Sequence, residues 1–167
     1  MQSSISNNFL STGIPGEFSR SYNQMSRGAI LNSAVEANNI VGRVVLTVDG
    51  NDFEVGVAAD GNFAGVLISP KTAIRQTLEA QAFVSNDIQV EVAESGYLFL
   101  SLTAAAKNGD FVYFSDTDGS LATAAPATTA PAGHSRLPGG LVKGLNVSGA
   151  GTGEIYFDMT GSVAKTA

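Results

Sequence analysis

The chain has 167 residues, a formal net charge of −6 and no cysteine. The nine basic residues form no cluster, which excludes the basic surface that a nucleic-acid-binding protein needs. Without cysteine there are no disulfides, thiolate metal sites or cysteine nucleophiles. Charged residues make up only 14% of the chain, against roughly 25% in an ordinary globular protein. A surface with so few charges suits a protein that works against other subunits.

Residues 1–26 differ in composition from the rest of the chain. They are rich in Ser, Asn, Gly and Pro, and they lack the basic and apolar regions of a signal peptide. Such a segment is either a disordered tail or an extended arm, and its recurring aromatic residues favour the arm. We expect Phe9, Ile14, Phe18 and Tyr22 to anchor this arm on another chain and to contribute little to the fold of their own domain.

Residues 27–161 predict one β domain, in which short apolar runs alternate with turn signals such as Asp49-Gly50 and Asp60-Gly61. The strands expected in its first half are 29–31, 40–48, 53–57, 63–68 and 81–85. Residues 71–83 alone have helical spacing, and they predict at most a short helix within a long loop.

The second half of the domain contains the clearest hairpin signals. Residues 94–123 hold three short apolar runs, separated by turns at Asn108-Gly109 and Asp118-Gly119. The strands expected in this half are 88–93, 97–102, 111–114, 120–122, 141–147 and 154–159. Residues 122–133 are rich in Pro, Ala and Thr and predict an extended loop, and 162–167 predict a frayed tail.

About ten short strands at roughly ten-residue spacing describe an all-β domain. We therefore predict a small antiparallel β-barrel or sandwich with an extended N-terminal arm. No apolar run approaches the roughly 18 residues of a membrane helix, so no membrane partner is expected.

One acidic stretch begins like a calcium-binding loop. Asp116 and Asp118 have the spacing of its first ligands. However, Leu121 stands where that loop requires Gly, and Ala127 stands where it requires a bidentate Glu. A hairpin turn is the better interpretation, and no metal site is predicted.

Two further stretches have some features of a chemical site. The glycines of 149–153 have the look of a phosphate loop, but no Lys-Ser/Thr pair follows them. The single histidine, His134, lies beside the Pro-rich loop with no carboxylate neighbour in the sequence to orient it as a base. We predict no catalytic residue, no cofactor and no enzymatic activity.

Several pieces of the chain, taken in order, resemble a known family. They are Gly16-Glu17-Phe18-Ser19-Arg20; Phe63–Leu67 with Pro70-Lys71; Gly96-Tyr97-Leu98 continuing through Ala104–Ala106, Gly109-Asp110, Val112-Tyr113 and Gly119; and Arg136-Leu137-Pro138 with Val147–Gly151. Together they resemble the structural cement (head decoration) proteins of tailed bacteriophages. The similarity extends over residues 13–160, although the stretch 122–132 is less like the family.

The resemblance implies a β-rich protein without catalysis or cofactor that binds the outside of an assembled icosahedral head and bridges neighbouring capsomers. Its partners would be the major capsid protein and copies of itself, a trimer being favoured over a dimer. It would be made in the host cytoplasm and reside on the outer surface of the virion head. The alternative is a carbohydrate-binding or adhesin module of a phage fibre or cell surface, which would need exposed aromatic residues on one face of the sheet.

Overall fold

The computed structural model describes residues 13–68 and 83–159, and the chain is all-β as predicted. The strands are β1 (Glu17–Phe18), β2 (Met25–Leu31), β3 (Val44–Val48), β4 (Asn51–Val57), β5 (Phe63–Leu67), β6 (Gln89–Leu102), β7 (Phe111–Ser115), β8 (Leu121–Ala124), β9 (His134–Lys143) and β10 (Gly151–Asp158), with a 3-10 turn, η2 (Glu36–Asn38). The predicted anchor Phe9, the predicted tail 162–167 and all but Phe83 of the stretch 71–83, where a short helix was predicted, lie outside the described residues. Within the described ranges no helix is long and apolar enough to span a membrane.

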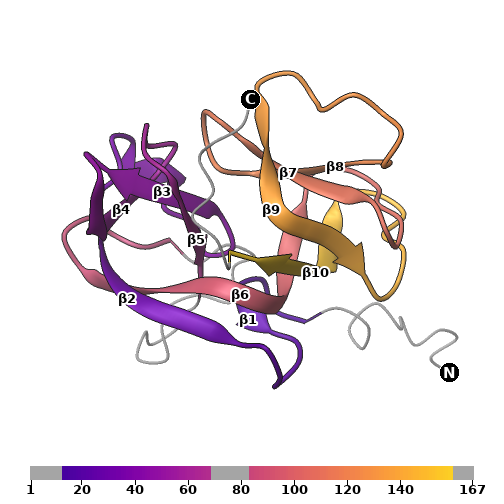
Figure 1. Ribbon diagram of the computed structural model, residues 1–167, viewed down its shortest axis with the longest axis horizontal. Helices are drawn as coiled ribbons and strands as arrows, with labels where there is room; N and C mark the ends of the chain where they lie inside the picture. The colour runs from indigo at the N-terminus through magenta and orange to yellow at the C-terminus, as the bar shows by residue number, and fades with distance from the viewer. Residues whose placement is uncertain (1–12, 69–82, 160–167) are drawn as a thin grey trace, which may run out of the picture.

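The strands close into two rings of five that share β6. In one ring β6 pairs with β2, which is followed by β4, β3 and β5, and β5 returns to β6. In the other, β6 pairs with β8, which is followed by β7, β9 and β10, and β10 returns to β6. Figure 1 shows the two groups side by side with β6 extending beneath both. The predicted barrel is therefore a pair of barrels, here called the β2–β5 barrel and the β7–β10 barrel.

Strand β6 can serve both barrels because it has 14 residues, far more than a mean strand of about 5–6. The sequence predicted two strands here, 88–93 and 97–102. The structure joins them through Gly96, whose φ of 137° is a conformation that L side chains rarely adopt. A Cβ at residue 96 would lie 2.9 Å from the Phe18 ring, so glycine also makes room for the chain that crosses β6 there.

Two hydrophobic clusters fill the fold, and β3 and β5 contribute to both. Val45 of β3 and Ala64 of β5 belong to the cluster inside the β2–β5 barrel. Their neighbours Val44 and Phe63 belong to the larger cluster, which also fills the β7–β10 barrel. Because side chains alternate across a strand, β3 and β5 are buried on both faces and fix one barrel against the other.

Other boundaries differ from the prediction in the second half of the domain. β9 begins at His134, earlier than the predicted 141, and β8 continues through Ala124 into the predicted loop 122–133. Both extensions pair with β7 on either side of it. These residues are strands because closure of the barrel places them beside β7. The local amino-acid composition does not indicate that pairing.

The last part of the predicted arm lies on the domain. β1 pairs with β6 at Leu98 and Phe99, and the predicted boundary at residue 26 falls inside β2. Along one edge of β6, β1 occupies the stretch between the pairing of β2 and that of β8. Residues 17–18 therefore fill a gap on the edge of the strand that the two barrels share.

Candidate interaction surface

A row of four partly buried side chains crosses the outer face of the β7–β10 barrel. Tyr97 of β6 lies directly opposite Tyr156 of β10, Tyr156 opposite Leu141 of β9, and Leu141 opposite Phe111 of β7. Their chain neighbours Leu98, Ile155, Val142 and Val112 are buried in the core, which places the row on the outside. We call these four residues the aromatic row. Directly opposed residues have Cβ atoms about 5 Å apart, so the row is continuous.

An arginine lies over the ring at each end of the aromatic row. The guanidinium carbon of Arg20 lies 4.2 Å from the Tyr97 ring centroid, and that of Arg136 lies 3.8 Å from the Phe111 ring centroid. Such cation–π contacts hold both charges on the barrel surface. Tyr and Arg are also among the residue types enriched in protein interfaces, whereas Lys and Glu are depleted there.

Arg20 also binds the arm to β10. Its Nε donates to Glu154 Oε1 at 2.9 Å and its Nη2 donates to Oε2 at 2.7 Å, a bidentate pair. The Ser19 hydroxyl donates to Glu154 Oε1 at 2.6 Å. The hydrogen bond from Arg20 holds the pKa of Glu154 below its usual value and raises that of Arg20. Both groups are therefore charged at neutral pH.

The tyrosines continue the same surface onto the arm. The Tyr22 ring centroid is 5.4 Å from that of Tyr97, and the Tyr97 centroid is 4.8 Å from that of Tyr156. A hydrogen bond from Arg20 lowers the pKa of Tyr22, whereas burial raises the pKa of Tyr156. The three tyrosine rings thus form a continuous stack, with the guanidinium of Arg20 lying over the middle ring.

The predicted anchors occupy different positions in the structure. Phe18 packs against the larger core cluster of its own chain. Ile14 and Tyr22 are 44% and 51% exposed. Among the described anchors, Ile14 and Tyr22 therefore retain surface for another chain, whereas Phe18 is a core contact of its own domain. Phe9 lies outside the described residues.

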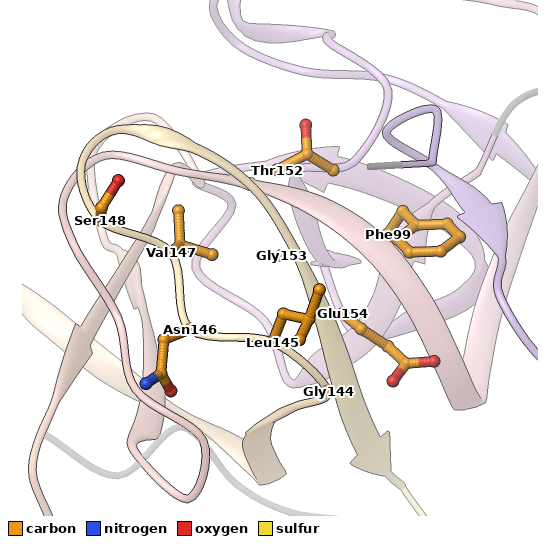
Figure 2. A pocket seen from close by; sticks show the side chains of 9 residues that line it. All are labelled: Phe99, Gly144, Leu145, Asn146, Val147, Ser148, Thr152, Gly153 and Glu154. Carbon is orange, nitrogen blue, oxygen red and sulfur yellow. The ribbon is translucent and has the colours of Figure 1, made fainter. Parts of the chain in front are cut away.

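A hollow of about 350 Å³ lies on the surface of the β7–β10 barrel, and Figure 2 shows the side chains that line it. Phe99 of β6 and Glu154 of β10 line it together with the loop between β9 and β10. In that loop Leu145 is 72% exposed. The backbone of Gly13 lies against the Phe99 ring, since a Cβ there would be 1.9 Å from it. The hollow thus adjoins the first described residue of the arm.

The acidic stretch that contains Asp116 and Asp118 forms the hairpin turn between β7 and β8, as the sequence predicted. The Asp118 carboxylate accepts hydrogen bonds from the Ser120 backbone and hydroxyl, and Arg43 donates to the Asp118 carbonyl at 2.7 Å. Burial acts to raise the pKa of Asp118, but hydrogen bonds from Ser115 and Ser120 and the charge of Arg43 together lower it. These bonds tie the β7–β8 turn to the β2–β5 barrel. In the described ranges no three His, Cys, Asp or Glu residues could hold a metal ion.

His134 and the glycines of 149–153, the other two stretches with features of a chemical site, lie at the start of β9 and in the connection that leads into β10. The ring of His134 is 2.9 Å from the Ala132 carbonyl through Nδ1, at the start of β9. Gly149 lies in the connection between β9 and β10, and a strand follows it, as the sequence indicated. In the described part of the chain these glycines therefore precede a strand and not a helix N-terminus.

The sequence prediction missed the aromatic row. Its members are separated by as many as 59 positions, from Tyr97 to Tyr156. Alternation along each strand was visible and indicates which side chains share a face. Which strands are neighbours, and in which register, depends on barrel closure and cannot be read from any one segment.

Two of three comparisons relate the chain to known proteins. A family model described as "Structural cement protein (E217 gp24/Pam3 gp6)" matches residues 1–158. No curated protein matches the sequence. A chain of the solved structure "The capsid of Myoviridae Phage XM1" is similar in fold, with a TM-score of 0.63, 16% identity, and coverage of 89% of this chain and 92% of that one.

Proposed function

The chain belongs to the structural cement protein family of bacteriophages, and on that basis we propose that it binds the outer surface of an assembled head and bridges neighbouring capsomers. The family match over residues 1–158 is the observation that carries the proposal. The likeness to a chain of a phage capsid structure supports the fold. The function is that of a virion structural protein, and its partners are the major capsid protein and further copies of this chain.

The mechanism is thermodynamic linkage. A protein that binds the assembled shell and not the dissociated subunits stabilises the assembled state by RT ln(1 + [L]/Kd), where [L] is the free concentration of the binding protein. This amounts to about 2.7 kcal/mol when [L] is 100 times Kd. When one copy contacts two capsomers, its second contact forms within the same complex at a high effective concentration. Its overall affinity for the shell is therefore higher than that of either contact alone. No bond is made or broken, and His134 and the acidic turn have structural roles only.

The arm is the proposed head contact. Ile14 and Tyr22 are exposed on the described part of it, and Phe9 precedes them in the sequence. Aromatic side chains in such contacts typically cost on the order of 2 kcal/mol when truncated. Deleting residues 1–12 is therefore expected to weaken head binding at least ~10-fold, or about 1.4 kcal/mol.

The test uses heads that lack the protein. Full-length protein should sediment with them and raise the temperature at which they release their contents. The His134→Ala variant should do the same and serves as the control for the 1–12 deletion. If the full-length protein neither sediments with heads nor stabilises them, the cement function is wrong for this chain.

The adhesin alternative gains one observation, because the aromatic row does lie on one face of the sheet. Sugars stack on the open faces of aromatic rings, but the guanidinium of Arg20 covers the Tyr97 ring at 4.2 Å. The alternative is therefore less favoured. Binding of the protein to a panel of immobilised glycans, lost on Tyr156→Ala, would support it over the cement function.

A further inference from the structure

We propose that the hollow between β10 and the β9–β10 loop is the docking site for the N-terminal segment of the same chain, with the ring of Phe9 inside it. Residues 1–12 lie outside the described residues, and the described chain begins at Gly13, on the rim of the hollow. The docking itself needs no head. Its consequence for head binding, given below, rests on the proposed function.

A tight turn brings the arm onto the outer face of the β7–β10 barrel. The backbone N–H of Glu17 donates to the Ile14 carbonyl at 3.1 Å, so the chain reverses just before β1. On the far side of this turn, Gly13 lies against the ring of Phe99, which points outward between two core residues of β6. Because Phe99 also lines the hollow, the twelve residues that precede Gly13 start from its rim.

The direction of residue 13 selects Phe9 among the residues that precede it. The Cβ position of Gly13 points into the Phe99 ring and thus toward the barrel, whereas Ile14 is 44% exposed. Side chains alternate along an extended chain, so residues 11 and 9 would face the barrel as residue 13 does. Residue 11 is a serine and residue 9 is the phenylalanine. Four extended residues span at most about 14 Å, which brings Phe9 within reach of the hollow.

The hollow has the size and the lining that a phenyl ring needs. Its volume is about 350 Å³, and a cavity of roughly 150 Å³ is enough to hold benzene. Figure 2 shows Leu145 and Phe99 on either side of β10, and Leu145 is 72% exposed. The Glu154 carboxylate in the lining already accepts hydrogen bonds from Ser19 and Arg20, so it is not left for a cationic ligand. An apolar occupant therefore fits best.

The loop that forms one wall of the hollow is held by contacts that do not involve the arm. The backbones of Ala106 and Val147 exchange two hydrogen bonds of 2.8 Å. The Asn146 side chain accepts another from the Asn108 backbone at 2.9 Å. Leu145 precedes these contacts and stays at the surface of the described structure. Covering it with an aromatic ring removes apolar area from water, which favours docking.

Docking determines which residues of the arm face away from the barrel. With Phe9 in the hollow, Leu10 and Ile14 lie on the opposite side of the extended arm. An arm that is already held loses less conformational freedom when these residues meet the head. Under the proposed function, Phe9→Ala should therefore weaken head binding through the position of the arm, without Phe9 touching the head.

The first experiment is limited proteolysis of the full chain with chymotrypsin, which cuts after large apolar residues such as Phe9 and Leu10. Intact mass identifies the cut. Leu145→Asp places a charge in the hollow and should speed cleavage there at least ~10-fold, because the undocked fraction sets the rate. The matched control is Ile30→Asp, the same change at a residue of the β2–β5 barrel that is 50% exposed, and it should be cleaved as slowly as wild type.

A double-mutant cycle tests the pairing of Phe9 with the hollow. Phe9→Ala and Leu145→Ala should each lower the midpoint of urea denaturation. The combined variant should fall no further than Phe9→Ala alone, because both changes remove the same contact. Leu10→Ala, one position away and on the opposite side of the arm, should leave the midpoint unchanged in either background.

The outcomes separate this inference from the cement function. Cleavage that is equally fast in wild type and in Leu145→Asp overturns the docking even if heads are bound, and so do additive effects of Phe9→Ala and Leu145→Ala. Protection that is lost on dilution from roughly 100 to 1 µM means that the segment docks on a second copy, and it overturns docking on the same chain. Protection that persists on dilution, with coupled midpoints, in a protein that does not bind heads upholds the docking and rejects the proposed function.

Discussion

At the scale of the residue, Glu154 shows how one side chain can hold an arm to a barrel. It accepts hydrogen bonds from Ser19 and from Arg20, whose guanidinium in turn lies over Tyr97. Because Arg20 keeps the pKa of Glu154 below its usual value, the contact depends on pH with a defined sign. A depressed pKa contributes stability above the unfolded-state value, and that stability is lost as pH falls through the folded-state value.

Glu154→Gln should therefore lower the melting temperature at pH 7, where the carboxylate is charged and paired. The difference from wild type should shrink as pH falls below about 4.5, the ordinary pKa of a glutamate, because wild type loses the same charge. Thermal melts by circular dichroism between pH 7 and pH 3 measure it. A difference that grows on acidification would contradict this account of the contact.

The backbone conformation of Gly96 affects both β6, which contains it, and β1, whose Phe18 packs against it. Its φ of 137° lets β6 continue, and a Cβ would meet both Phe18 and the Asn23 carbonyl at 3.2 Å or less. Gly96→Ala should reduce the free energy of unfolding by about 1–3 kcal/mol, measured by urea denaturation. Gly149→Ala is the control, since nothing lies within 4 Å of its Cβ position, and it should be nearly neutral.

At the scale of the element, β1 divides the predicted arm into parts with different roles. Phe18 packs against the core of its own chain, whereas Ile14 is 44% exposed. Phe18→Ala should reduce the free energy of unfolding by roughly 2 kcal/mol, because a large side chain loses its burial. Ile14→Ala should leave the unfolding curve nearly unchanged. Equal effects of the two substitutions in the same denaturation experiment would mean that β1 does not anchor the arm.

At the scale of the whole molecule, β6 couples the two barrels. Its first half pairs with β2 and β5, and its second half pairs with β8 and β10. Val44 and Phe63 add a shared core between the barrels. Because both barrels pair with the same strand, neither can unfold without removing a strand from the other. We therefore expect them to unfold in one cooperative transition.

Leu100→Ala, a fully buried change in the part of β6 that serves the β7–β10 barrel, should cost about 2–5 kcal/mol. It should move the unfolding of both barrels to the same lower denaturant concentration. Hydrogen exchange read separately for β3–β5 and β7–β9 distinguishes the barrels. Two separate transitions would show that β6 does not couple them.

The sequence by itself determined the all-β class, the turn at Asn108-Gly109, the β7–β8 hairpin turn at Asp118-Gly119, and a resemblance to the family that the comparison confirmed. These follow from local chemistry, since alternation and turn residues act over a few positions. Only the tertiary structure decided that 88–93 and 97–102 are one strand shared by two barrels, and that Tyr97, Tyr156, Leu141 and Phe111 form a row. Strand order and register are set when distant segments bury a common core and close a ring, and no local pattern specifies which distant strand supplies the partner.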